Sequence, residues 1–168
     1  LQTDGGLSVA KDIVAGDDIK LLSDSASIFF GADSEIELRH VADDGLIIKH
    51  VGTGDGKEPS LTFQAGDNDI AQDDVLGSIF FQAPDEGAGT DAVLVSAGIE
   101  AISEGDFSSS SNATSLRFLT GASETAAEKM RIASDGKILV NHTSSQTMGP
   151  TTEPQIQIEG TDHHTGSM

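Results

Sequence analysis

The amino-acid sequence predicts an all-β chain made of short hairpins and meanders. One observation is a phrase that recurs along the chain, in which an apolar residue, Phe and a small residue stand at alternate positions. Alternation with a period of two residues is the pattern of a β-strand with one apolar face. A second observation is that Asp-Gly pairs, which tolerate the positive φ angles of tight turns, lie between alternating runs. A third is that helix-favouring residues gather in only one short segment.

The copies of this phrase begin at residues 28, 61, 79 and 116, so that their spacings are 33, 18 and 37 residues. Unequal spacings argue against a regular solenoid and favour hairpins separated by loops of variable length. A chain built from similar hairpins suits a shaft or scaffold, which needs no unique catalytic pocket. The copies are Ile28–Ala32, Leu61–Ala65, Ile79–Ala83 and Leu116–Thr120.

Alternation and β-favouring residues predict a close succession of strands. The pattern is cleanest at Glu35–Arg39 and Gln155–Glu159, where a polar face alternates with an apolar one. In chain order, the predicted strands are Ile19–Ser23, Ser27–Gly31, Glu35–Val41, Leu46–His50, Ser60–Ala65, Ser78–Ala83, Ala92–Ala97, Ile99–Ser103, Ser115–Thr120, Lys129–Ile132, Lys137–Val140 and Gln155–Glu159.

Turn-forming pairs separate these strands and predict hairpins or turns. One short helical turn is expected within Ser123–Met130, because Ser123 is a suitable helix cap and the alanines that follow favour helix. Ser108–Ser111, a run of serines, predicts a loop. The turn-forming pairs are Gly5-Gly6, Asp44-Gly45, Asp55-Gly56 and Asp135-Gly136.

Two polar loops divide the chain into three parts. Gly52–Pro59 ends a first block of strands, and Thr143–Pro154 precedes a final strand. We therefore expect β-meander repeats of a shaft in residues 1–58 and a β module in residues 59–145. Residues 146–168 are expected to be a linker and the first strand of a following module.

The composition predicts a thin structure. Hydrophobic residues make up 36% of the chain and aromatic residues 4%, with 7 Phe and neither Trp nor Tyr. Such a chain has little material for a thick core, yet each amphipathic strand leaves an apolar face and backbone edges to be covered. Three identical chains around an axis would cover both, which predicts an elongated, intertwined homotrimeric fibre. A dimer and a two-sheet sandwich are the alternatives.

The charge of the chain excludes two classes of partner. With 9 basic and 28 acidic residues, its formal net charge is −19. Such a surface repels nucleic-acid phosphates and anionic lipids, and no long apolar run is present, so we expect neither nucleic-acid binding nor membrane insertion. The absence of Cys excludes disulfides and thiolate metal sites. Because the chain begins at Leu1 and ends in a polar stretch, we interpret it as a segment of a longer polypeptide.

A longer series of motifs carries a family resemblance. The series consists of Gly77–Asp85, Ala97–Ala101, Leu116–Thr120, Glu128–Ile132 and Asp135–Val140. This order of strand, acidic loop, strand, Leu-x-Phe-x-Thr, Lys-Met-Arg-Ile and Asp-Gly resembles the repeated shaft module of bacteriophage tail fibre and tail spike proteins. The resemblance covers Leu61–Ser145 and is most specific at Lys129–Val140, although Asn141 stands where many relatives have Gly.

The resemblance implies a homotrimer located in the phage tail of a virion, where it helps the virion to attach to a host. Its partners would be its own copies, other tail proteins and, through a distal domain, a glycan of the host cell surface. On this hypothesis the chain is a structural shaft segment, not an enzyme, with no catalytic residues, cofactor or metal. The residues expected in the fibre interior are Phe30, Phe63, Phe81 and Phe118, with Ile28, Leu61, Ile79 and Leu116 beside them.

Two groups of residues raise the question of metal binding. Asp67–Asp69 and Asp73–Asp74 contain oxygen ligands of the kind that Ca²⁺ prefers, but the loop lacks the glycine and glutamate that an EF-hand requires. We therefore expect a solvated acidic loop. His40 and His50 end two strands that could pair, and histidines on a trimer axis can bind a transition metal. Nothing in their spacing requires such a site, and a surface role is expected.

Catalytic patterns are weak. No Gly-x-Ser-x-Gly nucleophile elbow is present. Glu35 and Glu37 share a strand face, as paired carboxylates can in glycosidases, but we interpret that face as the solvated side of an amphipathic strand. Sugar-binding sites usually offer aromatic platforms, which a chain without Trp and Tyr lacks. Two alternative functions remain open: a carbohydrate-binding or polysaccharide-degrading adhesin, and a calcium-stabilised bacterial surface adhesin.

Overall fold

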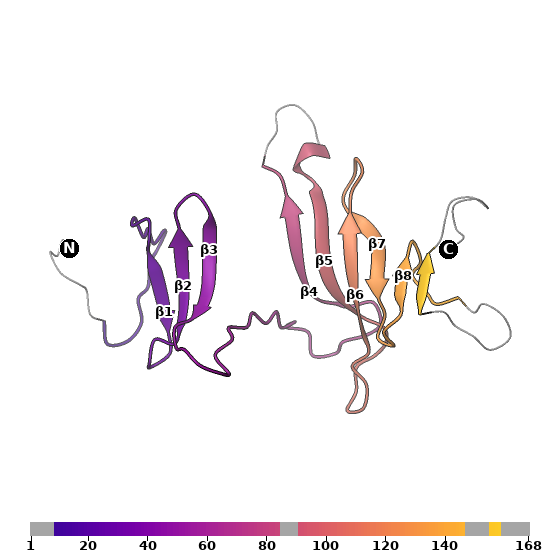
Figure 1. Cartoon of the computed structure of the whole chain (residues 1–168), viewed down its shortest axis with the longest axis horizontal. Coiled ribbons are helices and arrows are strands. Elements are labelled where there is room, and N and C mark those ends of the chain that lie inside the picture. The colour runs from indigo at the N-terminus through magenta and orange to yellow at the C-terminus, as the bar shows by residue number, and fades with distance from the viewer. Residues whose placement is uncertain (1–8, 85–90, 147–154, 159–168) are drawn as a thin grey trace. The chain divides into compact units, whose positions relative to one another are not determined.

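The protein is described by a computed structural model that covers residues 9–84, 91–146 and 155–158. The chain divides into two compact units, Leu1–Leu61 and Thr62–Met168, and each contains one β-sheet (Figure 1). Among the described residues, the single helical element is a three-residue 3-10 helix, η1 (Asp91–Val93). The prediction of an all-β chain is therefore confirmed.

The first unit holds a three-stranded antiparallel meander. Its strands are β1 (Ser27–Phe30), β2 (Ile36–Val41) and β3 (Gly45–His50), in that order across the sheet. The predicted Asp44-Gly45 hairpin joins β2 to β3, and the amide of Asp44 donates to the carbonyl of Val41 over 3.1 Å. The left-handed angles of this turn fall on Asp43 (φ 62°) and Gly45 (φ 150°).

The second unit holds a six-stranded sheet whose strands follow one another in chain order. Neighbouring strands are antiparallel from β4 to β8, whereas β9 is parallel to β8. The sequence placed this last strand in a following module, but β9 adds to the edge of the same sheet. The strands are β4 (Val75–Gln82), β5 (Val95–Ser103), β6 (Thr114–Thr120), β7 (Ala127–Ile132), β8 (Ile138–Val140) and β9 (Ile156–Ile158).

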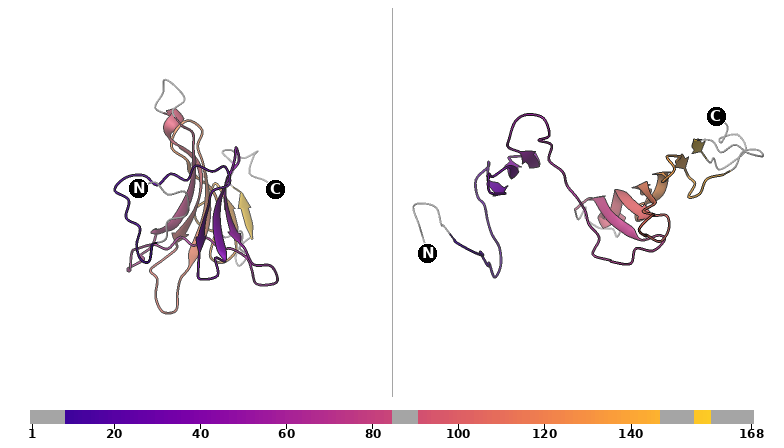
Figure 2. Two further views of the ribbon diagram at one scale, coloured as in Figure 1. Left: turned by 90° about the vertical axis from the view of Figure 1, so that its left-hand side faces the viewer. Right: turned by 90° about the horizontal axis from the view of Figure 1, so that it is seen from below.

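Each sheet is a single layer of strands, as the edge-on view in Figure 2 shows. Among the described residues, the buried large hydrophobic side chains are Ile102 and Leu139, which are 5% and 1% exposed. Leu139 is covered where the segment after β8 folds back. There the amide of Gln146 donates to Oε1 of Gln157 over 2.7 Å, and Nε2 of Gln157 donates to Oγ of Ser145 over 3.0 Å.

Two predicted strands are absent, because local alternation without a partner does not form a strand. Neither Ile19–Ser23 nor Ser60–Ala65 pairs with another segment, and both are irregular. Leu22 and Leu61 are accordingly 90% and 63% exposed. The Phe phrase at 61–65 therefore contributes a side chain to the second unit without contributing a strand.

Near β5, pairing between strands also produces a structure that differs from two predictions made from the local sequence. The predicted strands Ala92–Ala97 and Ile99–Ser103 are one strand that runs through Gly98, where the missing side chain makes room for the ring of Phe80. The helical turn predicted within Ser123–Met130 is wrong: the chain makes a bend there and then enters β7. The amide of Ala126 donates to the carbonyl of Val95 over 2.8 Å, so this bend bonds to β5.

The remaining turn predictions have mixed outcomes. Asp135-Gly136 forms the β7–β8 hairpin, with the amide of Gly136 donating to the carbonyl of Ala133 over 2.9 Å and φ at 84°. At Asp55-Gly56 the chain turns, with φ of Gly56 at 71°, but the turn joins no pair of strands. Gly5-Gly6 lies outside the described residues.

We predict that Leu139→Ala destabilises the second unit by about 2–5 kcal/mol, the usual cost of removing a fully buried leucine side chain. Hydrogen–deuterium exchange of β7 and β8 peptides measures this loss locally, without interference from the first unit. Lys129→Ala, a truncation at an exposed position of β7, is the matched control. Equal exchange in the two variants would contradict the burial of Leu139.

Candidate functional site

Two rows of apolar side chains cross all strands of the second sheet on one face, which we call the apolar face. The strand register sets these side chains side by side, because opposed residues on neighbouring strands point to the same face. One row is Ile79, Ile99, Phe118, Met130, Val140 and Ile158. The other is Gly77, Ala101, Leu116, Ile132, Ile138 and Ile156. Neither row contains a charged residue.

The apolar face is open to solvent in a single chain. Ile79 is 45% exposed and Leu116 is 40% exposed. At the two edges of the face, Phe81 on β4 is 55% exposed and Ile156 on β9 is 59% exposed. Isolated exposed hydrophobic residues need no explanation, but a contiguous patch that spans six strands is typical of an interaction surface.

A groove with a volume of 280 Å³ lies at the β4 end of the apolar face. Phe63 and Leu116 line it together with Gly77 and Ala101. The small size of these last two residues makes the groove deeper at their positions. Phe63 lies against Gly77, since a Cβ on this glycine would come within 2.7 Å of the Cβ of Phe63. None of the described residues that line the groove is charged. It is suited to an apolar side chain and offers nothing to an ion.

The opposite face carries a ladder of ionic hydrogen bonds across β4 to β7. Oγ of Ser78 donates to Glu100 over 3.1 Å, and Nη2 of Arg117 lies 2.5 Å from Oε2 of the same glutamate. Nη1 of Arg117 is 3.9 Å from Glu128, which in turn accepts two bonds from Arg131, at 2.5 and 2.6 Å. We call these five residues the polar ladder. Glu100 is 7% exposed, so the ladder is shielded from water.

Glu104 ties the ends of several strands together beside this ladder. Its carboxylate accepts bonds from the hydroxyls of Ser115 and Ser134, and from the amide of Ser134 over 2.9 Å. Burial alone would raise the pKa of Glu104, but these hydrogen bonds and the nearby Arg131 outweigh it and lower the pKa. The hydrogen bonds that Arg131 donates to Glu128 raise the pKa of Arg131. Both groups are therefore held in their charged forms.

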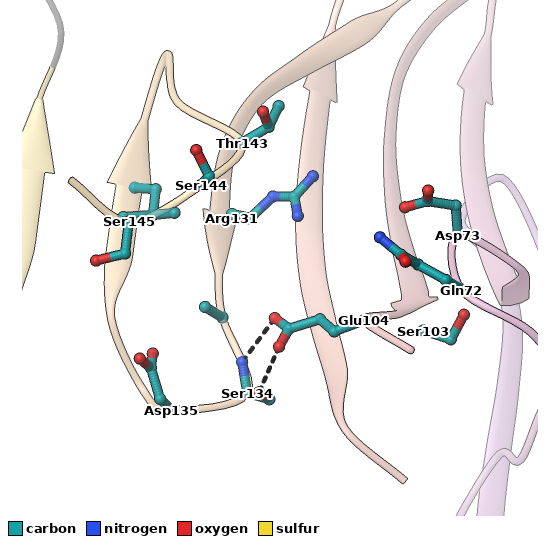
Figure 3. Close-up of a pocket in the computed structure, with 12 residues that line it drawn as sticks. Gln72, Asp73, Ser103, Glu104, Arg131, Ser134, Asp135, Thr143, Ser144 and Ser145 are labelled. Atoms are coloured by element: carbon teal, nitrogen blue, oxygen red, sulfur yellow. Dashed lines mark hydrogen bonds between the residues drawn. The ribbon is translucent and has the colours of Figure 1, made fainter. Parts of the chain in front are cut away.

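A polar cavity of 440 Å³ lies between Glu104, Arg131 and the segment after β8 (Figure 3). Hydroxyls of Thr143, Ser144 and Ser145 line one side, and Gln72 and Asp73 line the other. In Figure 3 the two oxygens of Glu104 turn toward Ser134, which uses them as hydrogen-bond acceptors. The cavity is lined by groups that hydrogen-bond small polar molecules, but its Glu104 carboxylate already accepts hydrogen bonds from Ser115 and Ser134.

The acidic loop uses its carboxylates to bond its own backbone. Oδ1 of Asp67 accepts the amide of Asp69 over 2.9 Å, and Oδ2 of Asp74 accepts the amide of Ala71 over 2.7 Å. Asp106 accepts the amide of Gln72 over 3.3 Å. Within the described ranges, no group of three or more His, Asp or Glu side chains is arranged to hold a metal ion.

The structure separates His40 from His50. In the β2–β3 register His40 lies opposite Leu46 near the hairpin turn, whereas His50 lies opposite Ile36 at the far end. His50 accepts the amide of Gly52 at Nδ1 over 3.1 Å. The β2–β3 pairing predicted from the sequence is thus correct, but it does not bring the two histidines together within one chain.

The interpretation of Glu35 and Glu37 as a solvated pair is wrong for Glu37. This carboxylate is 7% exposed and accepts the hydroxyl of Ser27 over 2.6 Å, because β1 lies beside it in the sheet. Glu35 lies before β2, and its carboxylate sits against Gly31, where it occupies the space that a side chain would need. The two side chains therefore have different surroundings: Glu37 accepts a hydrogen bond, whereas the buried Oε2 of Glu35 has no hydrogen-bond partner among the described residues.

The residues expected in a fibre interior are mostly exposed in a single chain. Four of them, Ile79, Phe81, Leu116 and Phe118, lie together on the apolar face, and Phe63 borders its groove. In the first sheet, Ile28 and Phe30 share a face, where they lie opposite Leu38 and Ile36. Leu61 is 63% exposed in the irregular segment. Burial of these side chains stays a prediction about an assembly.

The chain matches no protein family model, and comparison with curated proteins finds no significant relative. The part of the chain that the structure describes also contains no helix long and apolar enough for a membrane span. Any functional proposal therefore depends on the geometry and on the motifs themselves.

Sequence reasoning missed the polar ladder and the role of Glu104. Charged residues in amphipathic strands, such as Glu100, Arg117, Glu128 and Arg131, usually mean a solvated face. Opposite charges at alternating positions of consecutive strands could have indicated the pair of Glu100 and Arg117. Glu128 and Arg131 are three residues apart in β7 and come to one face only through a bulge, which alternation does not predict. Glu104 gives no such signal, because it follows β5 and bonds Ser134, which is 30 residues away.

We predict that Glu104→Gln lowers the stability of the second unit at pH 7 by about 1–2 kcal/mol, since bonds to a charged acceptor are lost. A lowered pKa in the folded state means that Glu104 stabilises the fold above its unfolded pKa of about 4.3, and that this contribution disappears as the pH falls further. The difference in stability between the variant and the wild type should therefore become smaller as the pH falls below about 4.

Hydrogen exchange of β6 and β7 peptides at several pH values measures this effect. Glu124→Gln, a change at an exposed glutamate of the same unit, is the matched control and should show no such trend. If the stability lost in Glu104→Gln were independent of pH, this result would contradict the proposed role of the charge.

Proposed function

We propose that this chain is a shaft segment of a bacteriophage tail fibre or tail spike, in which copies of the chain cover one another's apolar faces. The observation that carries the proposal is the apolar face itself: two uncharged rows on a single-layer sheet, open to solvent in one chain. A layer of secondary structure must bury its apolar side against another layer. No helix of the described chain is available to do so.

The motif series supports the family assignment. Lys129–Val140, the most specific part of the resemblance, forms most of β7, the Asp135-Gly136 turn and β8, which are adjacent strands of the sheet. Leu116–Thr120 lies in the adjacent strand β6, so the motifs that follow one another in sequence are neighbours in one sheet. The series therefore describes one structural module.

Energetics favour coupled folding and association. Fully burying a large apolar side chain contributes about 1.5–3 kcal/mol, so covering half-exposed side chains across this face contributes on the order of 5 kcal/mol per chain. The net stability of a small domain is about 5–15 kcal/mol, which is of the same size. Association would thus supply a large part of the stability of the shaft.

In this proposal the function is mechanical. A homotrimer provides a stiff spacer between the virion tail and a host-binding domain, while the acidic loops face solvent. Exposed strand edges at β4 and β9 are available for pairing between chains, which would remove them as sites of unspecific aggregation.

A second candidate, a carbohydrate-binding adhesin, is favoured by the polar cavity, whose hydroxyl, carboxylate and guanidinium groups could bond a sugar. No aromatic residue lines this cavity to stack on a sugar ring. We therefore give this candidate second place, and saccharide binding that is abolished by Arg131→Ala would raise it to first.

We expect light scattering of the whole chain to give the mass of a trimer, and the same mass after EDTA is added. The physical reason is that apolar contacts hold the copies together, and these do not require a metal. A monomer would contradict the shaft proposal. A trimer that dissociates in EDTA would favour a calcium-stabilised adhesin.

We also expect Phe81→Ala to destabilise the assembled protein by about 3–5 kcal/mol per chain, the usual cost of truncating a buried phenylalanine. In a single chain this side chain is 55% exposed, so an effect of that size requires cover by another chain. Thermal unfolding followed by circular dichroism measures it, with Lys129→Ala as control. A melting curve equal to that of the wild type would argue against an interior position for Phe81.

A further inference from the structure

Phe80 gives the second sheet a half-exposed aromatic side chain on the face opposite to the apolar face. Successive residues of a strand point to opposite faces, so Phe80 and Phe81 flank the edge strand β4 on its two sides. They are 52% and 55% exposed (Figure 1 shows β4 at the edge). The ring of Phe80 rests on its own chain, because a Cβ on Gly98 would come within 2.8 Å of Cδ1 of the ring. Leu119, opposite Gly98 on β6, continues this small apolar patch.

A cyclic homotrimer needs two different surfaces on every chain. Each copy contacts one neighbour through a first surface and the other neighbour through a second, since only a two-fold axis lets a patch meet itself. The apolar face with its groove is the first surface. The patch of Phe80 and Leu119 is a suitable second surface, because it is apolar, half-exposed at Phe80 and located on the opposite side of the same sheet.

Shape and chemistry match between the two surfaces. A cavity of about 150 Å³ with apolar walls holds a benzene molecule. The groove measures 280 Å³ and its lining is uncharged, so it has room for a phenyl ring and the methylene that carries it. Within the chain, Phe63 on Gly77 and Phe80 on Gly98 already show phenylalanine lying on a residue without a side chain.

The size of the apolar face also requires a second surface. Six strands about 4.8 Å apart with two rows of side chains cover about 400 Å² in projection. A stable interface buries about 800 Å² on each partner, so contact through the apolar face alone falls short of it. An additional apolar surface on the other side of β4 helps to supply the missing area.

From this geometry we infer that Phe80 of one copy inserts into the groove between Phe63 and Leu116 of the next copy. The partner is a second copy of this chain, and the inference rests on the proposed function, since it assumes that copies meet through the apolar face.

Intrinsic fluorescence tests this contact, because the chain has neither Trp nor Tyr. Phe80→Trp keeps a large aromatic side chain and introduces a single indole at this position. In the assembled protein we expect a blue-shifted emission and quenching by acrylamide that is several-fold weaker than for Lys129→Trp, the exposed control. Ala101→Leu, a change on the groove floor that leaves the strand pattern intact, should return the emission of Phe80→Trp to that of an exposed indole.

Light scattering on the same samples separates the two proposals. A trimer with a protected indole that Ala101→Leu exposes supports the insertion of residue 80. A trimer whose indole is exposed, or is unaffected by Ala101→Leu, overturns the inference and leaves the shaft proposal standing. A monomer overturns both. Circular dichroism of each variant shows that the sheet has formed, so that misfolding is not mistaken for a lost contact.

Discussion

A sheet with two broad faces needs cover on at least one of them, and this constraint governs the second unit. Its apolar side chains, gathered in two rows, stay open to solvent in one chain, and the described residues bury only Ile102 and Leu139 among large hydrophobic groups. Most of the other buried side chains are polar, Glu100 and Ser115 among them. Backbone pairing and polar contacts therefore order the sheet within the chain, whereas the shaft proposal assigns most hydrophobic stabilisation to association.

The polar ladder explains how such a sheet can be ordered before its apolar face is covered. Burying charged groups is unfavourable because they lose their hydration. Hydrogen bonds within a network offset this desolvation energy only when its donors and acceptors are matched. Here Glu100 bonds both Ser78 and Arg117, and Glu128 receives a bidentate bond from Arg131. The contacts from Ser78 to Glu100, from Glu100 to Arg117 and from Arg117 to Glu128 each join neighbouring strands, so they favour one register and present the two apolar rows in alignment, whereas the bond from Arg131 holds Glu128 in place within β7.

Both sheets place the same tripeptide on an edge strand. Ile28-Phe29-Phe30 forms most of β1, and Ile79-Phe80-Phe81 lies within β4. Phe29 and Phe30 are 52% and 53% exposed, much like their counterparts in β4. An edge strand with aromatic residues on both faces is unsuited to contact with water on either side. The shaft proposal accounts for this feature in both units, because copies on either side of an edge strand would cover both rings.

Local sequence determined much of the fold. Alternation predicted β1 to β4 and β6 to β9 near their observed positions, and Asp44-Gly45 and Asp135-Gly136 predicted their hairpins, because strand period and turn conformation are local properties. The tertiary structure decided what depends on a partner. The segment at 60–65 found no strand to pair with, residues 121–126 bent to bond β5 instead of forming a helical turn, and Glu37 became buried because β1 lies beside it. The polar ladder and the groove also required the register, which brings together residues far apart in sequence and is set by the whole sheet.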